Sequence, residues 1–192
     1  IQKPYEDGVE ACRHEKSERL TNGELTGADS SLHADTVKYY TMNKRVVYGG
    51  GGIMPDLFVP IDTTQSSPYF GQLVRKGLLN TFALTYVDEN RDDLKQRYSS
   101  VEQFAKQYQV GEVMMDALAA FAAKEGVEAE PEGLKRSEAL IALRLKALVA
   151  RDLWDTSAYW QVINADNPVD RSFQKALEVL SDNSFQRLGM SR

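Results

Sequence analysis

The sequence predicts an α+β protein that is mainly α-helical, with a short β-strand or hairpin segment followed by a helical, bundle-like domain. Two observations lead to this fold class. The stretch 36–61 is rich in β-branched and aromatic residues on both sides of four consecutive glycines. After about residue 66, apolar residues recur at spacings of three and four, as they do on one face of a helix. We therefore expect two domains, residues 1–65 and 66–192.

Composition restricts the class of protein. The chain has 192 residues, of which 42% are hydrophobic and 27% charged, values typical of a soluble globular protein. The formal charge of −5 argues against nucleic acid as a partner, because phosphate binding requires a concentrated Lys/Arg surface. No run of about 18 apolar residues is present, so we expect no membrane span. The chain begins with Ile1 and not with Met, which indicates a processed product or an excised part of a longer protein.

The first domain is predicted to contain one hairpin. Two strand patterns, 36–41 and 45–48, flank a turn at 42–44. Before them, residues 7–20 are rich in charge and predict a solvent-exposed helix, and 26–35 predict a loop.

The glycines that follow the hairpin predict a tight backbone turn. Each glycine costs conformational entropy when it becomes ordered and adds no side chain to packing, so its use lies in backbone geometry. A phosphate-binding loop is the alternative, but it needs Lys and Ser/Thr directly after the glycines and a helix that opens there. Pro55 stands in that position and blocks a helix, so a structural turn is the favoured interpretation.

This segment also carries a resemblance to a known family. It reads Arg45-Val46-Val47-Tyr48-Gly49-Gly50-Gly51-Gly52-Ile53-Met54-Pro55-Asp56. It resembles a motif of the C-terminal processing, or tail-specific, serine peptidases. Two other segments are similar to that family, in the form with a long helical tail typical of Bacteroidetes-like sequences. They are Ile1-Gln2-Lys3-Pro4-Tyr5 and Leu145-Lys146-Ala147-Leu148-Val149-Ala150-Arg151-Asp152-Leu153-Trp154.

The resemblance implies what the whole protein does. In that family a Ser nucleophile is deprotonated by a Lys, and a PDZ-like domain binds unstructured C-termini of protein substrates. Both would lie upstream of this chain, so no catalytic residue is carried over and the chain alone is expected to be inactive. The resemblance further implies that 7–35 is an insertion, that the location is periplasmic or in the cell envelope, and that no cofactor is needed. Its implied structural turn near the peptidase core consists of Gly49, Gly50, Gly51, Gly52, Pro55 and Asp56.

One weak cluster of potentially reactive residues stands outside this motif. Cys12 is the single cysteine, close in sequence to His14 and Glu15, and His33 is the only other histidine. A structural zinc site usually needs four ligands, and a Cys-His pair needs an orienting group. We therefore expect neither a metal site nor a nucleophile, and interpret the cluster as part of a charged helix.

The second domain is predicted to contain about five amphipathic helices. Ser67-Pro68 starts a helix of about five turns through residue 85, and Ser100 with Gln103 forms a capping box. A third apolar stripe runs over 110–121 and is closed at Gly126.

A longer helical pattern covers 132–163, and Asn167-Pro168 starts a last helix. The pairs Met114-Met115 and Tyr159-Trp160 are expected to fill the core, because neither pattern suggests a ligand site.

Two functions from different classes follow. The first is a structural or regulatory part of a tail-specific serine endopeptidase, whose partners are the upstream segments and protein substrates. The second is a helical interaction module for self-association, giving a homo-oligomer, or for adaptor docking. A free-standing enzyme of another kind is the third alternative, supported only by the Cys12 and His14 cluster.

Overall fold

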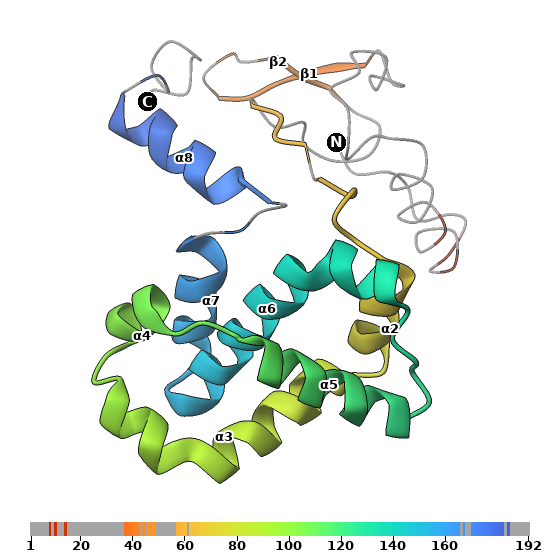
Figure 1. Ribbon diagram of the computed structural model, residues 1–192. Coiled ribbons are helices and arrows are strands. Elements are labelled where there is room, and N and C mark those ends of the chain that lie inside the picture. The colour runs from red at the N-terminus through yellow and green to blue at the C-terminus, as the bar shows by residue number, and fades with distance from the viewer. Residues whose placement is uncertain are drawn as a thin grey trace. The chain divides into compact units, whose positions relative to one another are not determined.

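The computed structural model describes residues 8, 10, 14, 37–42, 44, 46–48, 57–60, 62–165, 167, 170–182 and 184. Its contacts divide the chain into two units, Ile1–Ile61 with Leu177–Arg192, and Asp62–Ala176. The described part is mainly helical and contains one two-stranded sheet (Figure 1). The predicted fold class, α+β and mainly α, is confirmed.

The sheet is the predicted hairpin. Strands β1 (Lys38–Tyr40) and β2 (Val46–Tyr48) pair antiparallel, with Lys38 opposite Tyr48. In the connection, the Lys44 N–H donates to the Thr41 carbonyl at 2.9 Å, and Lys44 has a positive φ of 58°. A turn followed by one left-handed residue is a common way to close a short hairpin loop.

The helical unit begins where the Ser-Pro signal places it. Helix α2 (Pro68–Arg75) is capped by the Ser67 hydroxyl, which accepts from the Phe70 N–H at 3.2 Å. The expected five-turn helix through residue 85 is wrong, because α2 stops and a second helix, α3 (Leu78–Arg97), starts after Gly77. Gly77 has a φ of +69°, a left-handed conformation that ends a helix at little cost only for glycine.

The next two helices are α4 (Val101–Gln107) and α5 (Glu112–Lys124). The Ser100 hydroxyl accepts from the Gln103 N–H at 3.2 Å, as the capping box predicts. The Gln103 side chain, however, accepts from the N–H of Ser99 and not of Ser100. Gly126 follows α5 with a φ of +72°, which confirms the predicted stop.

The last described helices are α6 (Pro131–Leu153), α7 (Thr156–Ala165) and α8 (Ser172–Ser181). The continuous helix predicted over 132–163 is therefore wrong. The Asp155 carboxylate accepts from the Ala158 N–H at 2.9 Å, which caps the start of α7 and competes with continuation of α6. Helix α8 starts at Ser172, four residues after Pro168, where the sequence predicted the start of the last helix.

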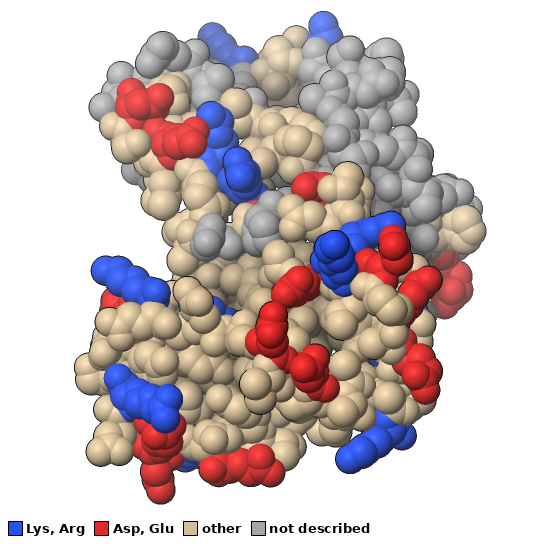
Figure 2. Space-filling model, in the orientation of Figure 1, with Lys and Arg blue, Asp and Glu red and all other residues tan. Residues whose placement is uncertain are grey.

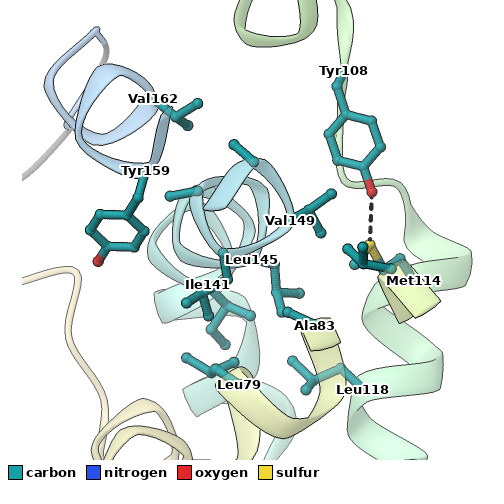
Figure 3. Packing of buried hydrophobic residues seen from close by; sticks show 14 of the residues in the cluster. Leu79, Ala83, Tyr108, Met114, Leu118, Ile141, Leu145, Val149, Tyr159 and Val162 are labelled. Atoms are coloured by element: carbon teal, nitrogen blue, oxygen red, sulfur yellow. Dashed lines mark hydrogen bonds between the residues drawn. The ribbon is translucent and has the colours of Figure 1, made fainter. Parts of the chain in front are cut away.

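Helix α6 is the centre of the helical unit. Ten of its residues are buried, and it packs against α2, α3 and α7. Figure 3 shows Ile141 and Leu145 of α6 facing Leu79 and Ala83 of α3. Burial of such aliphatic side chains contributes about 1.5–3 kcal/mol each, so α6 is the main source of stability of this unit.

Two expectations about apolar residues are only partly right. Met114, Met115 and Tyr159 are buried, as core residues should be, but Trp160 is 55% exposed. On α5 the buried face is rotated from the predicted stripe, so that Val113 is 86% exposed.

Candidate functional site

A groove in the helical unit is the best candidate for a binding site. It has a volume of about 460 Å³ and is formed by the end of α4 with the segment after it, by α6 and by α7. Ligand sites in proteins commonly have volumes of about 300–1,000 Å³. The lining residues are Ala105, Tyr108, Gln109, Val110, Ala139, Ala142, Leu143, Lys146, Val162 and Ala165.

An aromatic cluster fixes the wall of the groove that follows α4. Tyr108 is 6% exposed and stacks on Phe104, with ring centres 4.4 Å apart. Phe104 in turn contacts Trp154 after α6, with ring centres 5.5 Å apart. The Tyr108 hydroxyl donates to the Met114 sulfur at 3.3 Å (Figure 3). The stacked ring and the hydroxyl bond thereby hold the start of the segment between α4 and α5.

Burial affects the protonation of this tyrosine. Desolvation raises the pKa of the Tyr108 hydroxyl well above its ordinary value of 10.0, and the contact with Tyr86 adds to the rise. The hydroxyl therefore stays protonated at neutral pH and remains a donor to Met114.

Lys146 supplies the charge of the groove. It lies on α6, and its ammonium donates to the Ala105 carbonyl in the last turn of α4 at 2.6 Å. The other nine lining residues are neutral at pH 7. Figure 2 shows charges of both signs spread over the visible face with neutral surface between them.

Two other cations in the described part of the chain also bond to the C-terminal end of another helix. Lys76 after α2 donates to the Glu125 carbonyl after α5, and Arg91 of α3 donates to the Asp152 carbonyl of α6, both at 2.9 Å. Carbonyls at helix ends lack an intrahelical partner and lie at the negative end of the helix dipole. These bonds tie α4 to α6, α2 to α5 and α3 to α6.

A buried pair of serine hydroxyl groups connects α2 to α6. The Ser137 hydroxyl donates to the Ser67 hydroxyl at 2.7 Å, and both residues are buried. A Cβ added at Gly133 would lie 3.6 Å from the Ser67 oxygen, so the helices approach closely there. Among the described residues neither hydroxyl bonds to a histidine or lysine, and we assign the pair to packing and capping.

None of the residues singled out from the sequence is among the described residues that line the groove. Gly49, Gly50, Gly51, Gly52, Pro55 and Asp56 fall outside the described residues, directly after β2. The predicted structural turn stays a prediction. Cys12 and His33 are also outside the described part, and His14 is exposed. Within the described ranges, no group of three or more His, Cys, Asp or Glu could hold a metal ion.

The sequence analysis did not predict the groove, although the residue spacing of one of its walls can be seen in the sequence. Ala139, Ala142 and Lys146 follow one another at spacings of three and four, and so lie on one face of α6. Pairing that face with Ala105 and Val110 requires the tertiary structure.

Comparison with known proteins gives one match. Residues 69–155 match a protein family described as a family of unknown function (DUF8443). The matched region runs from α2 to the end of α6 and so includes two of the three walls of the groove. No curated protein and no solved structure matches the chain. None of the helices in the described residues combines the length and the apolar character needed to cross a membrane.

Proposed function

We propose that this chain is the C-terminal part of a tail-specific serine endopeptidase and serves that enzyme as a structural or regulatory region. The observation that supports this is the motif from Arg45 to Asp56, whose first strand, β2, is paired in the hairpin directly before the glycines. The Ser/Lys dyad and the PDZ-like domain of the enzyme would lie upstream. The proposed location is the periplasm or the cell envelope.

In this proposal the upstream dyad performs the chemistry. A Lys whose pKa is lowered by desolvation takes the proton of the Ser hydroxyl, and the Ser attacks the peptide carbonyl. The peptide C–N bond then breaks, the amine leaves with the proton from the Lys, and water hydrolyses the resulting acyl-enzyme. The glycine segment would let the backbone pass close to the catalytic core. The helical unit contributes a rigid frame, with its core on α6.

Activity of two proteins tests this proposal. This chain and a version extended upstream into the parent are incubated with a fluorophosphonate probe and with an unfolded protein substrate. We expect labelling and cleavage only with the extended protein. Activity of this chain alone, or inactivity of a folded extended protein, would contradict the proposal.

A pair of variants of the extended protein examines the glycine segment. Gly51→Val should lower turnover, because a branched side chain obstructs close approach of the backbone. Gly111→Ser, a change at an open position in the helical unit, is the matched control and should retain activity. Turnover and stability of Gly51→Val equal to those of the unchanged extended protein would count against a role for the turn.

A helical interaction module is the second candidate function. It is favoured by α8, where Phe173, Leu177 and Leu180 are 44%, 51% and 63% exposed. Their spacing places them on one face of the helix, as in amphipathic helices that dock into grooves. A molecular mass that increases with protein concentration would support self-association, and a constant monomer mass would argue against it.

A further inference from the structure

The described methionines differ in their access to solvent. Met42 lies in the connection between β1 and β2, and its relative exposure is 102%, so its whole side chain is open to water. Met114 and Met115, near the start of α5, are 8% and 7% exposed and belong to the core of the helical unit. A dissolved reagent therefore reaches the Met42 sulfur directly, whereas the other two sulfurs are shielded by the fold.

Hydrogen bonding adds to this difference. A thioether reacts through a lone pair on its sulfur, and the Met114 sulfur accepts from the Tyr108 hydroxyl at 3.3 Å, which engages that lone pair. The connection that carries Met42 is closed by a backbone bond, in which the Lys44 N–H donates to the Thr41 carbonyl at 2.9 Å. The closed connection therefore does not depend on the Met42 side chain.

We propose that Met42 is a site of reversible oxidative modification, at which a hydroperoxide converts the thioether to a sulfoxide. The sulfur lone pair attacks the terminal peroxide oxygen, and the O–O bond breaks. The second oxygen takes the proton of the transferred hydroxyl and leaves as an alcohol, or as water when the reagent is hydrogen peroxide. The sulfur is thereby oxidised and the peroxide reduced. A methionine sulfoxide reductase with two thiols reverses the change, because the oxygen leaves as water while the thiols form a disulfide.

Oxidation at this position changes the polarity of the surface and leaves the core intact. A sulfoxide is polar and chiral, and it disrupts a core in which it forms. At the fully exposed Met42 it places a polar group at the end of the hairpin, close in sequence to the exposed Tyr39 and Tyr40 of β1. The proposal concerns the hairpin by itself and does not depend on the peptidase assignment.

Peptide mass spectrometry of this 192-residue chain after brief exposure to hydrogen peroxide tests the proposal. Digestion after Lys and Arg places Met42 alone in residues 39–44, and Met114 with Met115 in residues 107–124, where fragment ions separate them. We expect Met42 to take up oxygen at least about tenfold faster than either core methionine, in line with the exposures. Equal rates in the folded chain overturn the proposal.

The unfolded chain is the control for the role of structure. In concentrated guanidinium chloride all three sulfurs are open to solvent, so the peptides with Met42, Met114 and Met115 should take up oxygen at similar rates. If the preference for Met42 persists after unfolding, neighbouring residues and not the fold cause it, and the proposal is wrong.

Reversal and tolerance are measured on the same chain. Treatment with a methionine sulfoxide reductase and a dithiol should return residues 39–44 to their original mass, and a sulfoxide that stays contradicts reversibility. Met42→Gln, which is polar as the sulfoxide is, should shift the unfolding temperature by less than about 2 °C. Met114→Gln should lower it by more than that, because a polar group enters the core. Equal losses in the two variants would show that the fold does not tolerate a polar group at Met42.

Discussion

Tyr108 shows how one buried polar group organises its surroundings. Its ring packs between helix ends and its hydroxyl bonds to Met114, so a residue that forms a wall of the groove is also part of the core. Tyr69 is buried as well, and its hydroxyl has no hydrogen-bond partner among the residues that the structure describes. Burial raises the pKa of the Tyr69 hydroxyl too.

The raised pKa of Tyr108 predicts loss of stability at high pH. An unfolded tyrosine ionises near pH 10, whereas folded Tyr108 holds its proton to higher pH. Its contribution is therefore fully present below pH 10 and is lost as the pH rises beyond 10, with a slope of about 1.4 kcal/mol per pH unit. Urea denaturation between pH 9 and 11.5 should show a shallower decline for Tyr108→Phe.

The control for this measurement is Tyr40→Phe, at a position of β1 that is 67% exposed. This change should leave the decline as steep as in the unchanged chain. The prediction fails if Tyr108→Phe and the unchanged chain lose stability in parallel above pH 10.

At the scale of elements, glycine conformation decides where two helices begin and end. Gly77 has a positive φ between α2 and α3, and Gly111 has a negative φ before α5. An added Cβ meets no atom within 4 Å at either position. The two sites therefore differ in backbone conformation and not in available space.

The same substitution should have opposite effects at these two glycines. Gly77→Ser should lower the free energy of unfolding by about 1–2 kcal/mol, because an L-residue is strained in the left-handed region. Gly111→Ser should raise it by about 0.5–1 kcal/mol, because the unfolded chain loses freedom and the hydroxyl can cap α5. Denaturation curves of both variants measure this, and changes of the same sign would show that the conformational argument is wrong.

For the whole molecule, the packing around α6 determines stability. Leu145 points toward α3 (Figure 3) and is 0% exposed. Leu84 of α3, in contrast, is 49% exposed. Leu145→Ala should cost about 2–5 kcal/mol, because it removes buried methyl groups and leaves a cavity.

The matched change Leu84→Ala should cost less than about 1 kcal/mol, because little apolar area is lost at an exposed helix position. Thermal unfolding of the two variants gives the comparison. Similar losses would show that α6 is not the centre of the core.

The amino-acid sequence by itself determined the local features of this protein. The hairpin, the Ser67 and Ser100 caps and the stop at Gly126 depend on residues within a few positions of one another, so their patterns predict them. The fold class follows from the β-branched and aromatic residues of the stretch 36–61 and from the helical spacing of apolar residues after residue 66.

Only the tertiary structure decided where the long helical patterns break and which of their faces are buried. Gly77 and Asp155 each fit a helix interior or a helix boundary by their sequence alone, and the structure places a helix boundary at both. The groove likewise brings together residues 41 positions apart in the bond from Lys146 to Ala105. Long-range contacts of this kind have no local pattern, because they depend on how helices pack in three dimensions.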